Sequence, residues 1–183
     1  MSFPFLHLHH FHAHPVSGTY FLKLCLYLSG PGRKIFRNSQ LHGYFMILEI
    51  CQKLKDAGYD PWAQWYADGA SVDIEMRPVV WTEAIQNGDN DMFEKLMSGE
   101  KKVADYPYFA KGLEAWGARM GNWARNDATS NKQSDANEIF LSGKAGMLYQ
   151  GTWNYGSLES LKSDDFDYGF FFVPTDDSGK EPV

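Results

Sequence analysis

The chain has 183 residues, with 17 Lys and Arg against 23 Asp and Glu and a formal net charge of −6 at pH 7. With 44% hydrophobic and 22% charged residues, the composition is globular rather than disordered or fibrous, and the length predicts one domain or one domain with a tail. No apolar run reaches the ~18 residues of a membrane span, two cysteines are too few for a disulfide framework or a zinc site, and the acidic balance argues against a nucleic-acid partner.

The charge divides the chain near residue 45. Residues 1–48 contain no acidic side chain and carry +4, whereas all 23 acidic residues follow from Glu49 onward, where the charge is −10. The apolar run 21–28 is short and no Lys or Arg precedes it, so it makes a poor secretory signal. Residues 1–44 are therefore predicted to be a leader without regular structure, or the product of a shifted reading frame, and residues 45–183 to form the domain.

Five of the six histidines lie in the first 14 residues, at His7, His9, His10, His12 and His14. Clustered imidazoles can bind zinc, copper or nickel, but no carboxylate or thiolate lies nearby to complete a closed site. The spacing matches no catalytic motif. We therefore predict no functional metal site there.

An amphipathic helix opens the predicted domain at about Phe45. Its apolar side chains recur at the i, i+3, i+4, i+7 spacing of one helix face, at Ile47, Ile50, Cys51 and Leu54. Gly58 follows where a left-handed C-terminal cap is needed. Because Cys51 lies on the apolar stripe, we interpret it as a buried thiol and not as a nucleophile.

Further along the chain, predicted strands are separated by one or more helices. The predicted order is a strand at 61–67, a helix at 71–86 with an uncertain register at Pro78, a short helix at 91–96, a longer helix at 109–120, a helix from Ser134 to Gly143, a strand at 145–150, a turn at 151–154 leading into a short helix, and a strand at 167–173. Near-continuous apolar strands between helices are typical of a buried, mainly parallel sheet. The sequence thus predicts an α/β domain.

Catalytic templates are missing from the sequence. It contains no phosphate-binding glycine loop and no nucleophile elbow, and the only histidine after residue 14 is His42, so the domain lacks the base of a Ser/His/Asp triad. A carboxylate pair for glycoside hydrolysis stays possible in principle. We interpret Glu75, Glu83 and Glu94 as part of solvated helix faces.

Tryptophan is the more informative residue, because all six lie from Trp62 onward. Trp153 directly follows a strand and the residues Gly151 and Thr152, and it opens a helix. In a parallel α/β sheet this is the carboxyl edge, where ligands bind. An indole there offers a flat apolar face to a sugar ring, Gly151 permits close approach of the backbone, and the helix start supplies N–H donors. The alternative is that Trp153 only covers the sheet edge.

A family resemblance supports the sugar hypothesis. The stretch 139–153, IFLSGKAGMLYQGTW, resembles the signature region of the sugar-binding extracellular solute-binding proteins of bacterial ABC importers (the maltose-binding-protein-like family 1). The usual pattern is F-x-x-G-K-A-A-M, a strand, then G-x-W, and Gly146 replaces its second alanine. Residues 167–175 resemble the strand that returns to the hinge. Residues 45–61 resemble a family helix whose usual T-W-[DE]-E-[FL] opening is replaced by His42, Gly43 and Tyr44.

The resemblance implies most of the C-terminal lobe of a two-lobed protein that closes on a sugar, a periplasmic-binding-protein-like α/β lobe that is incomplete in this chain. By carry-over, Trp153 would stack on the sugar, with Gly151 and Asn154 in the same ligand-binding turn. The loop residues Ala67, Asp68 and Gly69 would face the same cleft. Asp68 would accept hydrogen bonds from sugar hydroxyls, or would be a turn aspartate facing solvent.

The leading hypothesis is carbohydrate or oligosaccharide binding for an ABC importer, with weak or lost binding because one wall of the cleft is missing. Its implied partners are a sugar and the membrane permease subunits, its implied location is the extracellular face of the membrane or the periplasm, and it involves no catalytic residue, metal or cofactor. The alternatives are a glycoside hydrolase fragment that uses a carboxylate pair and a non-functional gene remnant.

Overall fold

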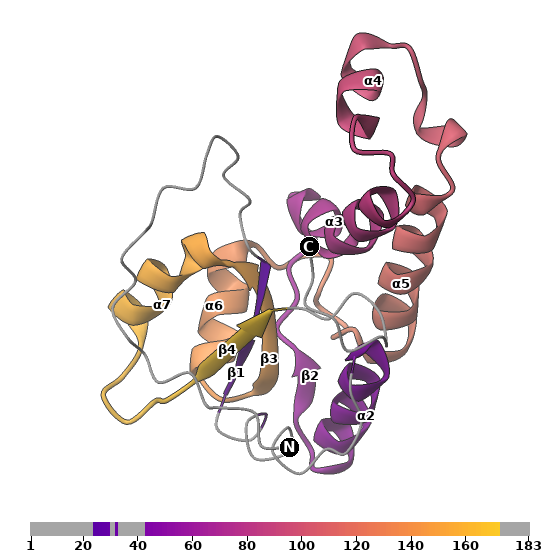
Figure 1. The fold of residues 1–183 in the computed structure, drawn as a ribbon. Helices are drawn as coiled ribbons and strands as arrows, with labels where there is room; N and C mark the ends of the chain where they lie inside the picture. Colours follow the sequence, from indigo (N-terminus) through magenta and orange to yellow (C-terminus); the bar gives the residue numbers. More distant parts are fainter. Residues whose placement is uncertain (1–23, 30–31, 33–42, 173–183) are drawn as a thin grey trace, which may run out of the picture.

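The computed structural model describes residues 24–29, 32 and 43–172. The cluster of histidines between His7 and His14 lies outside the described residues. Figure 1 shows helices packed around a four-stranded sheet. Its elements are β1 Leu24–Leu28, α2 Gly43–Asp56, β2 Asp60–Trp62, α3 Ala70–Gln86, α4 Met92–Ser98, the 3-10 turn η1 Val103–Asp105, α5 Tyr108–Trp123, α6 Gln133–Leu141, β3 Ala145–Gly151, the 3-10 turn η2 Thr152–Asn154, α7 Tyr155–Leu161 and β4 Gly169–Phe172.

The strand order in the sheet is β2-β3-β1-β4. β2 runs parallel to β3, with Trp62 opposite Met147. β1 runs antiparallel to both β3 and β4, so the three strands expected from the sequence all point in one direction. This confirms the predicted α/β class. The strand β1 corrects one expectation, because it belongs to the segment predicted to lack regular structure, yet it lies inside the sheet.

Two apolar clusters cover the sheet. One joins α2 to the strands through Ile47, Ile50, Cys51, Leu54, Trp62, Met147 and Tyr149. The other lies under α6 and α7 and contains Ala63, Trp65, Ala136, Phe140, Ala145, Leu148, Leu158 and Tyr168. Trp62 and Trp65 therefore enter different clusters, and both are buried because helices cover the sheet on both sides. Cys51 is a buried thiol, as its place on the apolar stripe predicts.

Turn residues set several of the helix ends. Gly58 and Gly143 have the positive φ values of 82° and 73° that the predicted left-handed caps require. The predicted start of α6 is wrong, because the helix begins at Gln133 and the backbone N–H of Lys132 donates to Asp135 Oδ2 at 2.8 Å. An aspartate in the first turn therefore caps the backbone N–H of Lys132, and Ser134 lies inside the helix.

The strand predicted at 61–67 leaves the sheet early. Ala63 N–H still donates to Met147 O at 2.8 Å. The next backbone donors turn to another part of the chain, Tyr66 to Ala128 O at 2.8 Å and Ala67 to Asn131 O at 3.1 Å. β2 consequently ends at Trp62, and the chain beyond it is held by the loop between α5 and α6.

None of the helices in the described part of the chain combines the length and the apolar character that a membrane span requires.

Candidate functional site

Two of the predicted ligand-binding segments leave the sheet at the same edge. β2 and β3 are parallel, so their carboxyl ends lie on one side of the sheet. The loop with Ala67, Asp68 and Gly69 follows β2, and the turn with Gly151, Trp153 and Asn154 ends β3. The structure therefore places the predicted residues at the edge where open α/β sheets bind ligands.

Trp153 lies against the backbone of Gly151. A Cβ atom built on Gly151 would fall inside van der Waals contact with three atoms of the six-membered ring of the indole. The indole therefore covers the Cα of Gly151, while 40% of the residue's surface stays exposed. Gly151 has φ −85° and ψ 170°, values open to any residue, so the side-chain position of Trp153 is what requires a glycine here.

Asn154 does not fit the predicted role of a ligand contact. Its side chain is fully buried and exchanges two hydrogen bonds with Asn137, at 2.9 and 3.2 Å. Its Oδ1 also accepts from Gln133 Nε2 at 3.1 Å. The sequence expectation is corrected at this point, because these bonds anchor the turn of Trp153 to helix α6 and use the amide groups that a ligand would need.

The loop Ala67–Gly69 is exposed and forms the entry to α3. Gly69 has φ 74°, a left-handed conformation that favours glycine. Asp68 Oδ1 accepts the backbone N–H of Ala70 at 3.2 Å, the bond typical of a turn aspartate. Both interpretations of Asp68 stay open, since the bond uses one of its oxygens and leaves the carboxylate at the surface.

A buried polar chain that the sequence did not suggest lies behind this loop. Gln64 Nε2 donates to the hydroxyl of Tyr66 at 2.9 Å, and that hydroxyl donates to Glu75 Oε2 at 2.8 Å. Glu75 is 4% exposed, so its interpretation as part of a solvated helix face is wrong. A carboxylate is tolerated in such a place because the phenol and its other partners satisfy it.

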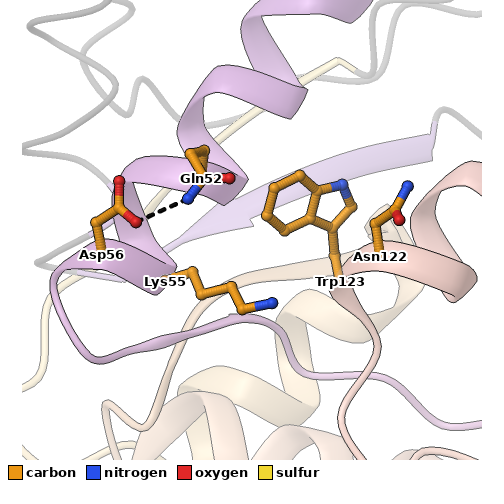
Figure 2. Close-up of a pocket in the computed structure, with 5 residues that line it drawn as sticks. All are labelled: Gln52, Lys55, Asp56, Asn122 and Trp123. Atoms are coloured by element: carbon orange, nitrogen blue, oxygen red, sulfur yellow. Dashed lines mark hydrogen bonds between the residues drawn. The ribbon is translucent and has the colours of Figure 1, made fainter.

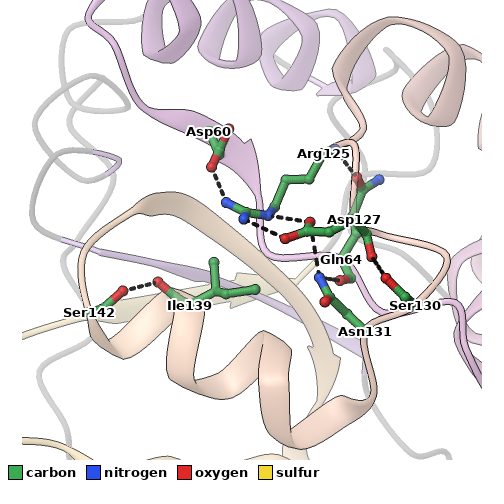
Figure 3. Close-up of polar contacts among 8 residues, drawn as sticks. All are labelled: Asp60, Gln64, Arg125, Asp127, Ser130, Asn131, Ile139 and Ser142. Atoms are coloured by element: carbon green, nitrogen blue, oxygen red, sulfur yellow. Dashed lines mark hydrogen bonds and ion pairs between the residues drawn. The ribbon is translucent and has the colours of Figure 1, made fainter.

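The polar stretch 125–133 forms a network along the outer edge of β2 (Figure 3). The guanidinium of Arg125 binds both carboxylate oxygens of Asp127 at 2.8 Å each and also pairs with Asp60. Asn131 Nδ2 donates to Gln64 O at 3.3 Å and to Asp127 Oδ1 at 3.2 Å. This loop takes the place of a further strand and protects the edge of β2.

The charges of this network reinforce one another. Hydrogen bonds from Arg125 hold the pKa of the Asp127 carboxyl below its ordinary value, against the smaller opposing effect of partial burial. The hydrogen bonds to Asp127 likewise raise the pKa of Arg125. A bidentate arginine–carboxylate pair is among the stronger side-chain interactions in proteins.

The depressed pKa of Asp127 gives a pH-dependent stability. A carboxyl with a lowered folded-state pKa stabilises the fold above the ordinary aspartate pKa of about 3.9, and this contribution is lost as the pH falls through the folded-state value. Because the Asp127 side chain is 45% exposed, we expect Asp127→Asn to lower the free energy of unfolding by only about 1 kcal/mol at pH 7. Urea titrations at several pH values should show this difference shrinking at acid pH.

Asp164→Asn, a change to an exposed aspartate in the turn before β4, is the matched control for that titration. It should leave the free energy of unfolding within about 0.5 kcal/mol of the parent chain. A constant difference between Asp127→Asn and the parent chain from pH 7 down to pH 2 would contradict the assignment.

A hollow of about 400 Å³ opens elsewhere, between α2 and the end of α5 (Figure 2). None of the predicted site residues lines it; its lining consists of Gln52, Lys55, Asp56, Asn122 and Trp123. Its side chains largely interact with one another, since Gln52 donates to Asp56 at 2.7 Å and Lys55 Nζ lies 5.6 Å from the centre of the Trp123 ring. It lies near the amino end of β2 and not at the edge of Trp153, so we assign it no ligand.

Metal-binding side chains do not converge in the described residues, where no group of three or more His, Cys, Asp or Glu is placed to hold an ion.

Several solved structures with the same fold are described as binding proteins for solutes or sugars. The chain is similar to a chitin oligosaccharide binding protein (18% identity, TM-score 0.67, 88% of this chain and 40% of that one). It is also similar to a family 1 extracellular solute-binding protein from Bifidobacterium longum subsp. infantis (14%, 0.64, 84% and 39%), and to the protein RafE in complex with raffinose (12%, 0.65, 86% and 42%). The chain thus spans about 40% of the length of these proteins. At these identities the likeness shows the fold.

The comparison with protein families is more direct. No protein of curated function matches the sequence significantly. The family described as bacterial extracellular solute-binding protein matches residues 42–182, about three quarters of the chain. The match begins close to the change in charge near residue 45 and includes every element from α2 to β4. The chain therefore belongs to the bacterial extracellular solute-binding proteins.

Proposed function

We propose that the chain binds a carbohydrate at the carboxyl edge of its parallel strands, as part of the substrate-binding component of an ABC importer. The observation that carries this proposal is the position of Trp153, whose indole lies on Gly151 with 40% of the residue exposed. An apolar ring fixed on one side by the backbone is a suitable platform for the C–H face of a sugar. The family membership and the sugar-binding relatives support the same ligand class.

The proposal includes an extracellular or periplasmic place of action and no catalytic step. The family is extracellular, and its members and the solved relatives are binding proteins. Since the chain spans about 40% of those structures, we propose that it supplies one wall of a cleft and by itself binds sugars weakly. Incubation with chromogenic glycosides should give no turnover, which separates this proposal from a hydrolase.

Trp153→Ala tests the proposed platform. Loss of the indole should weaken the binding of a chitin oligosaccharide or raffinose at least tenfold, because stacked aromatic residues commonly contribute more than ~1.4 kcal/mol to binding. Saturation-transfer NMR detects such weak binding directly. The free energy of unfolding should change little, since the side chain is partly exposed.

Phe93→Ala is the matched control, because Phe93 is a 55% exposed aromatic residue on α4. It should leave sugar binding unchanged. If Trp153→Ala also leaves a detected binding unchanged, the proposed position of the ligand is wrong.

A further inference from the structure

One short segment, residues 131–137, connects the two parts of the proposed site. At its start, Asn131 O accepts the backbone N–H of Ala67 in the loop after β2, at 3.1 Å. Two residues on, Gln133 Nε2 donates to Asn154 Oδ1 beside Trp153, at 3.1 Å. The start of α6 therefore lies between the loop Ala67–Gly69 and the turn of Trp153, two segments that are far apart in sequence.

Two amide side chains of this segment bind the same Asn154 in different ways. Asn137 is 4% exposed and uses both its Oδ1 and its Nδ2 in the pair with Asn154. Gln133 is half-buried and its hydrogen bond to Asn154 uses one N–H. Its second N–H and its Oε1 have no partner among the described residues, so one acceptor and one donor stay available.

We propose that Gln133 contacts the sugar, giving and accepting hydrogen bonds with hydroxyl groups of the ring that stacks on Trp153. The inference rests on the proposed carbohydrate function and names a specificity-determining residue for it. An amide fits this chemistry because a hydroxyl is itself both a donor and an acceptor. The bond to Asn154 fixes the amide in place before the ligand arrives, which lowers the entropic cost of the contact. Asn137, in contrast, acts only as a support for the turn.

Gln133→Met tests the contact, since methionine keeps the approximate shape of glutamine and removes its hydrogen-bonding groups. Sugar binding should fall about tenfold or more, measured by saturation-transfer NMR, with a small change in melting temperature. Gln52→Met, at an exposed glutamine on α2, is the matched control and should leave binding unchanged. Asn137→Ala should instead lower the melting temperature, because it leaves a buried amide of Asn154 without its partner.

A set of deoxy sugars distinguishes direct contact from support. The analogue that lacks the contacted hydroxyl group should bind the parent chain about tenfold more weakly than the full sugar does. Gln133→Met should bind this analogue and the full sugar with equal affinity. If Gln133→Met weakens the binding of every sugar and analogue by the same factor, the direct contact is overturned. It is also overturned if Gln133→Met binds the sugar as tightly as the parent chain while Trp153→Ala abolishes binding. If the parent chain binds none of the sugars, the proposed function fails and this inference with it.

Discussion

Gly146→Ala should lower the free energy of unfolding by about 1–3 kcal/mol, the usual cost of adding a methyl group to a close-packed core. A Cβ atom on Gly146 would lie well inside contact distance of both methyl groups of Leu54. Leu54 is fully buried between α2 and the sheet, so it has little freedom to move. Urea denaturation followed by far-ultraviolet circular dichroism measures the effect.

The partner variant makes this test specific. Leu54→Ala alone should destabilise the chain by about 2–5 kcal/mol, because it opens a cavity. The double variant Leu54→Ala/Gly146→Ala should be destabilised by less than the sum of the two single variants, because the added methyl group fills part of the cavity. We expect a coupling energy of about 0.5–3 kcal/mol. Additive effects would show that the two residues do not pack together.

Gly156→Ala is the control for both variants. Gly156 lies in α7, and a Cβ atom there would meet nothing within 4 Å. An alanine in a helix is favoured over glycine by about 1 kcal/mol, so this variant should be as stable as the parent chain or more stable. The contrast separates contact with Leu54 from a general effect of replacing glycine.

Gly151→Ala should weaken sugar binding about as much as the loss of the indole itself, tenfold or more, or about 1.4 kcal/mol. The new methyl group would occupy space that the ring of Trp153 now fills, so the indole must move away from the backbone. The backbone of Gly151 suits any residue, and the effect therefore comes through the side chain of Trp153. Titration with the same oligosaccharide, with tryptophan fluorescence as a second signal, measures it.

The double variant Gly151→Ala/Trp153→Ala provides the internal control. Once the indole is absent, the methyl group has nothing to displace, so the double variant should bind sugar no more weakly than Trp153→Ala does. Binding by Gly151→Ala equal to that of the parent chain would mean that the ring does not lie on Gly151 when a sugar is bound.

The sequence predicted those elements that are determined by residues close together in the chain. Periodic apolar positions identified α2, and glycines after the last turn marked its end and that of α6, because these signals lie within a few residues of the structure that they determine. β1 was missed, since five residues without a neighbouring pattern become a strand only through their partners β3 and β4. Gly146 stands where the family pattern has alanine, and the residue that a Cβ atom would meet there, Leu54, is distant in sequence.

The residues of the candidate site also fall into two groups, those that the local sequence identifies and those that depend on contacts with other elements. Trp153 and Gly151 could be singled out from the sequence, because a strand, a glycine and a helix start follow each other directly. Asn154 was misassigned, since nothing local reveals that Asn137 binds its side chain. The burial of Glu75 and the contacts of Gln133 depend on how one element packs against another and not on the pattern within one element. The polar pattern of such residues is the same whether they face water, a ligand or one another.

The position of β1 inside the sheet has a consequence for how the chain folds. β4 is joined to the rest of the described sheet through β1, and β1 must pair with residues more than a hundred positions later, as in the bond from Ser29 to Gly146 across 117 residues. Closing so long a loop is entropically costly, and pairings of this kind raise the contact order of a fold. During synthesis β1 therefore leaves the ribosome long before β3 and β4 exist, and the described sheet can be completed only after residue 172 has been added.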